Sequence, residues 1–190
     1  MTDKQALRAE LRQRRAAHDA SISPNLRALL FNRPPAALLE LVAKNAVVSI
    51  YHPLPGEASP LSYARGFAEQ GHRVALPWFA ARGAPMAFKL WDNPFDESML
   101  VPDPYGAMQP PPGAADARVD VAIVPLLGFT DTGQRLGQGG GHYDRLLAAE
   151  PELVPIGLAW DCQLVDALPL EPHDRPLRAV VTPTRFYGPF

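Results

Sequence analysis

The sequence predicts an open α/β domain in which a largely parallel sheet carries helices on both faces. Short apolar runs rich in β-branched residues recur along the chain, and each has the length of one buried strand. Segments with helical periodicity separate these runs. The 22 prolines are spread among the segments and mark abrupt ends. Strands that alternate with helices need crossover connections, which join parallel strands.

The length fits one domain over residues 1–190, or at most two small ones. The net charge of −2 argues against nucleic acid and membrane surfaces as partners, because both require a broad basic surface. No apolar run approaches the roughly 18 residues of a membrane span, and the segment 1–15 lacks the apolar core of a signal peptide. We therefore expect a cytoplasmic protein, and we separately expect a monomer. The single cysteine, Cys162, excludes an internal disulfide.

The first half of the chain is expected to place helices around one buried strand. Thr2 and Gln5 have capping-box spacing and begin the first helix. A second helix starts at Ser23–Pro24, a cap followed by the residue favoured at the first helical position. The other elements predicted here are a helix over 36–44, the strand over 46–51 and a helix over 61–70 that closes at Gly71.

The second half is expected to alternate strands, helices and two long loops. Residues 93–115 carry six prolines and predict a long surface loop, which in a compact domain is either functional or mobile. Residues 125–141 form a glycine-rich loop. The remaining predicted elements are strands over 73–76, 86–91 (more exposed), 119–124, 154–160 and 178–181, and helices over 142–150 and 161–168.

A binding site is expected at one edge of this sheet. Ligands of open α/β sheets bind beyond the carboxyl ends of the parallel strands. The loops that follow Tyr51, Val124 and Trp160 occupy this position in the predicted sheet.

The glycine-rich loop has the features of a polyphosphate site. Its glycines allow positive φ angles, so that successive N–H groups can point into one concavity, and the helix that follows adds the positive end of its dipole. Arg135 and Arg145 bracket the loop with guanidinium groups that suit phosphate. A flexible linker would favour Ser over large residues such as Leu136 and Tyr143. The loop matches neither the P-loop nor the dinucleotide fingerprint.

Two carboxylates are candidates for a metal site beside the phosphates. Asp144 lies at the start of the helix after the loop, where it is either a residue favoured by the helix dipole or a Mg²⁺ ligand. Asp174 is the candidate second ligand, and its alternative is a solvated turn residue. Spacing alone leaves both alternatives open.

A basic stripe on the first helix also has two interpretations. Lys4, Arg8, Arg12 and Arg15 share one face, which is either a solvated surface or a cationic clamp over phosphates.

Further candidates lie in loops. Glu57, in a Pro-Gly turn after the first strand, is either a turn residue or a ligand contact. Trp91 and Tyr105 are either packing residues or side chains that stack on a flat ligand.

The glycine-rich loop and several other segments resemble the motifs of a known family. Residues 135–145, Arg-Leu-Gly-Gln-Gly-Gly-Gly-His-Tyr-Asp-Arg, are similar to the signature of the 5-formyltetrahydrofolate cyclo-ligases, also called 5,10-methenyltetrahydrofolate synthetases. The family's other motifs have similar counterparts here, in the same order: the segment 4–15, Glu57 after the first strand, and 172–174 before 180–182. The resemblance spans nearly the whole chain. The glycine signature is specific, whereas the terminal motifs are weak alone.

The resemblance implies a three-layer Rossmann-like fold and a reaction that needs ATP and Mg²⁺. The substrate would be the reduced folate 5-formyltetrahydrofolate, and the products 5,10-methenyltetrahydrofolate, ADP and phosphate. Asp144 and Asp174 would hold magnesium. ATP contacts are implied for Lys4, Arg8, Arg135, Gly137, Gln138, Gly139, Gly140, Gly141, His142 and Tyr143. Folate contacts are expected at His52, Glu57, Trp91, Gln138 and His142, and catalytic roles at Arg135, Tyr143 and Arg145.

Two positions depart from the family's pattern. Many members carry arginine where Gln138 stands, and tyrosine where His142 stands. A histidine can make ligand binding depend on pH near neutrality.

Two other functions stay open on the residues alone. One is a sugar-phosphate isomerase or CoA-transferase type of enzyme on a similar scaffold, since a fold does not fix a function. ATP hydrolysis that depends on a reduced folate would exclude it. The other is a non-catalytic folate or nucleotide binder, which would bind tightly without forming the methenyl chromophore.

Overall fold

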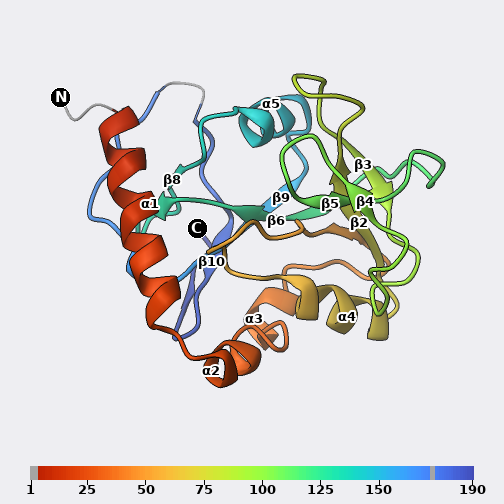
Figure 1. Ribbon diagram of the computed structural model, residues 1–190, viewed down its shortest axis with the longest axis horizontal. Helices are drawn as coiled ribbons and strands as arrows, with labels where there is room; N and C mark the ends of the chain where they lie inside the picture. The colour runs from red at the N-terminus through yellow and green to blue at the C-terminus, as the bar shows by residue number, and fades with distance from the viewer. Residues whose placement is uncertain (1–3, 172–173) are drawn as a thin grey trace.

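A computed structural model describes residues 4–171 and 174–190, and its centre is a seven-stranded sheet (Figure 1). The strand order is β11-β10-β9-β6-β1-β2-β3. The five inner strands pair in parallel, whereas β3 and β11 pair antiparallel at the two edges. The strands are β1 (Val47–Ser49), β2 (Arg73–Trp78), β3 (Ala87–Leu90), β6 (Val121–Pro125), β9 (Val154–Leu158), β10 (Ala179–Val181) and β11 (Phe186–Tyr187).

Helices cover both faces of the sheet, so the predicted three-layer α/β fold is confirmed (Figure 1). The chain steps from β1 to β2 in one direction and from β6 to β9 in the other. Because parallel crossovers are right-handed, these opposite steps place their connecting helices on opposite faces. The helices are α1 (Lys4–Ser21), α2 (Pro24–Leu29), α3 (Ala36–Leu39), α4 (Leu61–Glu69), α5 (His142–Ala149) and the 3₁₀ turn η1 (Asp161–Gln163).

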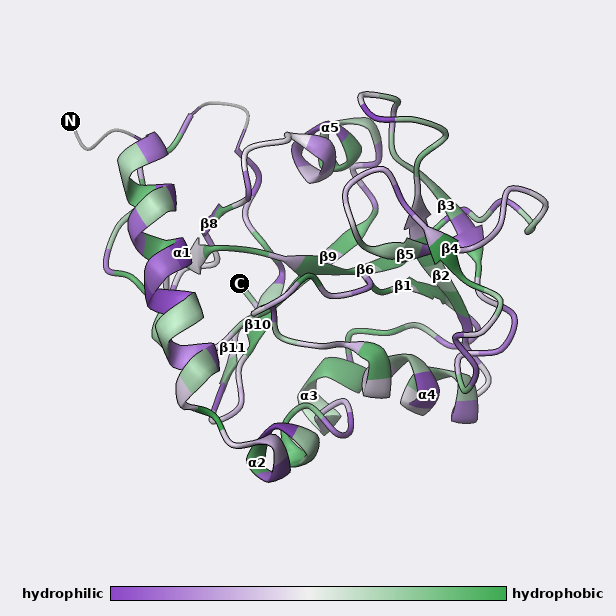
Figure 2. Cartoon of the chain, viewed as in Figure 1, coloured by the Kyte–Doolittle hydropathy of each residue, from purple (hydrophilic) through white to green (hydrophobic). Residues whose placement is uncertain are grey.

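The core lies on both sides of the sheet and follows the two-residue period of its strands. In β6, Ile123 packs into the cluster beneath α3 and α4, whereas its neighbours Ala122 and Val124 pack into the cluster that contains Leu147 of α5. Successive side chains of a strand point to opposite faces, which explains why an unbroken apolar run is needed here. Figure 2 shows that the central strands are mainly hydrophobic, whereas the surrounding helices carry both hydrophilic and hydrophobic residues.

Two predicted helices are much shorter than expected. The helix over 36–44 ends at Leu39, because Leu41 and Val42 donate to the carbonyls three residues earlier and tighten the chain into turns. The helix over 161–168 is reduced to the single turn η1. There the N–H of Val165 donates to the carbonyl of Phe129, so the chain pairs with another segment instead of continuing a helix.

Both predicted long loops contain strand pairs. Residues 93–115 include the hairpin of β4 (Val101–Pro102) and β5 (Met108–Gln109), and the glycine-rich segment includes the hairpin of β7 (Gly128–Phe129) and β8 (Arg135–Leu136). The strand predicted over 86–91 is less exposed than expected, since Phe88 and Lys89 are buried.

Two further points complete the comparison with the predicted elements. The edge strand β11 was not predicted, and the predicted cap at Thr2 lies outside the described residues. Within 4–171 and 174–190, no helix is both long and apolar enough to cross a membrane.

Candidate active site

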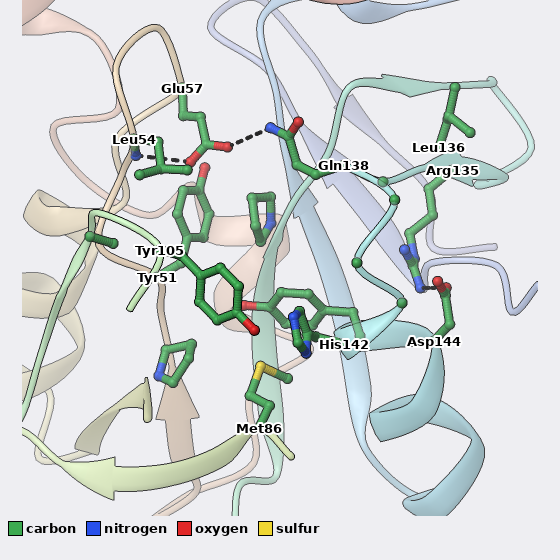
Figure 3. A pocket seen from close by; sticks show the side chains of 18 of the residues that line it. Tyr51, Leu54, Glu57, Met86, Tyr105, Arg135, Leu136, Gln138, His142 and Asp144 are labelled. Carbon is green, nitrogen blue, oxygen red and sulfur yellow. Dashed lines mark hydrogen bonds and ion pairs between the residues drawn. The ribbon is translucent and has the colours of Figure 1, made fainter. Parts of the chain in front are cut away.

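A cavity of about 490 Å³ opens at the carboxyl ends of β1 and β6 (Figure 3). Tyr51 reaches it just after β1, and Pro125 reaches it from the end of β6. The chain runs outward from these two neighbouring strands in opposite directions, which makes this point the topological switch of the sheet. Ligands of open α/β proteins bind at such a point. Two of the three predicted loops, those after Tyr51 and Val124, therefore line the cavity.

The basic stripe of α1 contacts the segments around this cavity. The ammonium of Lys4 lies 2.6 Å from Glu171 and 3.1 Å from Asp174. Arg8 Nε donates to the carbonyl of Gly137 at 3.1 Å. These contacts rule out a purely solvated face. Burial acts to lower the pKa of Lys4, but its hydrogen bonds to the two carboxylates outweigh burial and raise it.

The glycine-rich segment 137–141 carries unpaired main-chain donors toward α5. The carbonyl of Gly137 accepts a hydrogen bond from Arg8, and the carbonyl of Gln138 accepts one from Arg12. The N–H of the same peptide unit points the opposite way because the unit is planar and trans. In the described part of the chain, the N–H groups of 138–141 donate to no acceptor. Gly139 and Gly141 have φ angles of 102° and 65°, which side-chain-bearing residues rarely adopt. Unpaired amides before a helix N-terminus form an anion site.

Glu57 is held at the edge of the cavity by three donors. Its carboxylate accepts from Gln138 Nε2 at 3.0 Å, from the N–H of Leu54 at 3.0 Å, and from Arg15 at 3.4 Å. Both Glu57 and Arg15 are buried. Glu57 is thus a turn residue and a cavity residue at once. We call the surface formed by Lys4, Arg8, Glu57 and Gln138 the polar wall.

The third predicted loop has a supporting role. Trp160, after β9, does not reach the cavity, and its indole Nε1 instead donates to the carbonyl of Gly56 at 3.0 Å. Gly56 has a φ angle of 82° and forms the turn that presents Glu57. The loop after Trp160 therefore supports the turn that holds Glu57.

Three rings form the opposite side, which we call the aromatic wall. The ring centroids of Phe79, Tyr105 and His142 lie 4.9–5.3 Å apart in edge-to-face contacts. The buried side chain of Gln109 exchanges two hydrogen bonds with the main chain of Phe79, at 2.8 and 3.2 Å, and so fixes the β4–β5 hairpin against the end of β2. Burial and the neighbouring Arg145 lower the pKa of His142.

Two tyrosines complete the cavity between these walls. Burial, and then the charge of Glu57, raise the pKa of both Tyr51 and Tyr143, so both phenols stay neutral at physiological pH. Tyr51 donates to the carbonyl of Ala58. The buried hydroxyl of Tyr143 has no hydrogen-bond partner among the described residues. It is a polar group available to a ligand.

The two candidate metal ligands line the same cavity as the anion site. Asp144 is paired with Arg135, and Asp174 with Lys4 (Figure 3 shows the first pair). The described residues contain no group of three side chains able to hold a metal ion. Two carboxylates and the phosphate oxygens of a bound nucleotide are nevertheless the donor set that Mg²⁺ uses. The residues present therefore fit magnesium bound together with phosphate.

The remaining predicted residues are placed as follows. His52 lines the cavity, with Nε2 3.2 Å from Glu97. Trp91 does not line it: the side chain is buried in the core and donates to the carbonyl of Asp96, so the structure gives it the packing role. Arg145 is exposed, donates to the carbonyl of Gly140 and braces the loop. Residues 172 and 173 of the terminal motif lie outside the described residues.

Some cavity residues were not identified from the sequence. Phe79, Met86 and Met108 line it without belonging to any motif. Phe79 directly follows β2, so the rule for carboxyl strand ends could have identified it. The two methionines carry no comparable signal.

The fold and the cavity together define an open α/β protein with a candidate anion site at its topological switch. A family model described as "5-formyltetrahydrofolate cyclo-ligase family" matches residues 1–183. The 5-formyltetrahydrofolate cyclo-ligase of Escherichia coli K12 is 37% identical over 146 residues, which are 74% of this chain and 79% of that protein. The protein of the same name from Haemophilus influenzae is 28% identical over 92% of this chain and 94% of its own.

Solved structures give the same fold. The 5,10-methenyltetrahydrofolate synthetase of Aquifex aeolicus has a TM-score of 0.73 at 24% identity, covering 96% of this chain and 93% of that one. The protein of the same name from Mycoplasma pneumoniae has a TM-score of 0.62 at 20% identity, covering 94% and 98%. This chain belongs to the 5-formyltetrahydrofolate cyclo-ligase family, and the resemblance seen in its glycine signature is confirmed.

Proposed function

We propose that this protein converts 5-formyltetrahydrofolate to 5,10-methenyltetrahydrofolate at the expense of ATP, with Mg²⁺ as cofactor and ADP and phosphate as the other products. Family membership supports the folate reaction. The observation that carries the ATP requirement is the row of unpaired amides at 138–141, which faces the same cavity as two carboxylates and the cations of α1.

The cavity offers separate surroundings for the two substrates. The amides of the glycine loop and the start of α5 would bind the phosphates, with Lys4 and Arg8 supplying positive charge. The aromatic wall and Tyr51 offer flat apolar surface for the folate ring, and Glu57 would accept hydrogen bonds from its N–H groups. Both ligands would then meet near Tyr143, whose buried hydroxyl is unpartnered.

The proposed reaction needs activation of a weak electrophile. A formamide carbonyl is unreactive because nitrogen donates electrons into it. Transfer of the γ-phosphoryl group to the formyl oxygen gives ADP and turns that oxygen into a leaving group. The lone pair of N10 then bonds to the formyl carbon, the bond from carbon to the phosphorylated oxygen breaks, phosphate leaves with the electron pair, and N10 releases its proton.

The protein contributes position and charge to this chemistry. Phosphoryl transfer requires in-line placement and neutralisation of charge, and little covalent help. The glycine loop, held to α1 by Arg8 and Arg12, provides fixed main-chain dipoles that need no reorganisation during the reaction. Asp144 and Asp174 would hold the magnesium ion, which when bound neutralises charge on the phosphates.

An absorbance assay for the methenyl product tests the proposal. Product should form from 5-formyltetrahydrofolate only when ATP and Mg²⁺ are both present, with one ADP released per product. Tight binding of both substrates without product would identify a non-catalytic binder. Product formation without ATP consumption would overturn the proposed mechanism. The single-domain organisation, the monomeric state and the cytoplasmic location stay predictions.

A further inference from the structure

We propose that Gln138 is a positioning residue that couples the two substrate sites, so that bound nucleotide tightens the binding of folate and bound folate tightens the binding of nucleotide. The inference rests on the proposed function, since it assigns the phosphates to the glycine loop and the folate to Glu57. It assigns to one side chain a role in communication between these two sites.

Gln138 forms hydrogen bonds with Glu57 on one side and with Arg12 of α1 on the other. Its Nε2 donates to Glu57 Oε1 at 3.0 Å, as Figure 3 shows. Its side-chain oxygen accepts from Arg12 Nε at 3.3 Å, and its main-chain carbonyl accepts from Arg12 Nη2 at 2.9 Å. The side chain therefore uses its oxygen and its nitrogen at once, and its orientation is fixed by partners that are 126 and 81 residues away in the sequence.

Gln138 is the partner of Glu57 that belongs to the phosphate-binding segment. The other two donors to the Glu57 carboxylate are Leu54, in the same turn, and Arg15, on α1. Among the hydrogen bonds of the described residues, the bond from Gln138 thus joins the folate-facing carboxylate to the loop that carries the unpaired amides. A change in the order of that loop reaches Glu57 through this bond.

The direction of the coupling follows from which main-chain groups still lack partners before ligands bind. Gly139 and Gly140 are exposed and their amides are unpaired, so the loop gains order when phosphates occupy it. Bound phosphates further restrict this loop and with it Gln138, which already donates to Glu57, and so restrict the remaining freedom of the carboxylate. A pre-oriented carboxylate loses less freedom when the folate arrives, so the folate binds more tightly. Thermodynamic linkage makes the effect reciprocal.

Calorimetry measures the coupling directly. The affinity for 5-formyltetrahydrofolate is measured with and without saturating ADP and Mg²⁺, a pair that cannot support phosphoryl transfer. The natural chain should bind the folate at least about fivefold more tightly with ADP present, within the usual range of allosteric coupling. In Gln138→Met, which keeps the length of the side chain but removes both polar atoms, the ratio of the two affinities should fall to about one.

Two further variants separate coupling from general damage. Gln134→Met makes the same chemical change in the turn between β7 and β8, outside the cavity, and should keep the full ratio. Arg12→Met removes the residue that orients Gln138 and should lower the ratio without touching Glu57. Because the coupling is a ratio, an effect of a substitution on one ligand alone cancels. Thermal unfolding verifies that each variant is folded.

The outcomes distinguish this inference from the proposed function. If the natural chain binds no folate, the proposed function fails. If the natural chain binds folate and makes product but ADP leaves its folate affinity unchanged, the coupling is absent and only the inference is overturned. The same holds if Gln138→Met is folded and keeps the full ratio.

Discussion

The polar wall and the aromatic wall are built by different kinds of contact. The polar wall depends on directed hydrogen bonds between α1, the turn at Glu57 and the glycine loop. The aromatic wall depends on edge-to-face contacts between three rings. A missing partner in the first leaves a buried polar group unsatisfied, whereas rings can often be replaced by others of similar size. Substitutions in polar groups of the cavity should therefore have the larger effects.

The largest effect is expected from Asp144→Ala. The change removes a candidate magnesium ligand and leaves the buried Arg135 without its ion-pair partner. Turnover should fall on the order of 100-fold or more, the loss typical when charge stabilisation in a transition state is removed. The measurement is methenyl absorbance at saturating Mg²⁺, with circular dichroism to verify the fold. Unchanged turnover under these conditions would exclude the metal role.

The next largest effect is expected from Glu57→Gln. Removal of the charge weakens hydrogen bonds from the folate, and bonds to charged groups contribute about 1.5–3 kcal/mol, so folate affinity should fall about 10- to 100-fold. The affinity for ADP alone should change little. Calorimetry with each ligand separately decides the matter, and an equal loss for both ligands would contradict the separate placement of the two substrates.

A smaller effect is expected from Tyr105→Ala on the aromatic wall. Aromatic pairs contribute about 0.5–1.5 kcal/mol beyond the area they bury, so the KM for folate should rise several-fold. Tyr105→Phe is the matched control, because it keeps the ring contacts with Phe79 and His142. Steady-state kinetics should show near-natural values for the control. A loss of folate binding as large as that of Glu57→Gln would contradict the expectation that polar groups of the cavity matter more than the aromatic wall.

The smallest effect is expected from the titration of His142. Its pKa in the folded protein lies below the unfolded value of 6.5, so the neutral ring is favoured on folding. The stability associated with this difference is present above pH 6.5 and is lost as the pH falls through the folded pKa. His142→Phe should therefore lose less stability than the natural chain between pH 7.5 and 5.5. Unfolding midpoints across this range test the difference, and parallel curves would contradict it.

Much of the fold and part of the site could be predicted from the sequence. The β-branched runs at β1 and β6 and the glycine-rich loop are local patterns that depend on neighbouring residues. The stripe of α1 was visible because helical periodicity places Lys4 and Arg8 on one face. Its partners could not be predicted, since the contact of Arg8 with Gly137 joins residues 129 positions apart.

The predictions for the short elements were wrong for the same reason, since these elements depend on contacts with distant parts of the chain. The chain after Trp160 has a helical pattern, but pairing with Phe129 ends the helix after one turn. The proline-rich segment 93–115 was expected to be a loop, and Gln109 instead fixes it against Phe79 as part of the aromatic wall. In both places a tertiary hydrogen bond outweighs the local preference.

The sequence by itself determined the α/β class, the family and the position of the glycine-rich loop, because each is encoded in residues close together in the chain. The tertiary structure alone decided which groups face one another: Lys4 with Asp174, Gln138 with Glu57, and Tyr105 with His142. These pairs are set by how the sheet brings distant loops to one edge. That arrangement depends on the packing of the whole domain, so no pattern among neighbouring residues in the sequence predicts it.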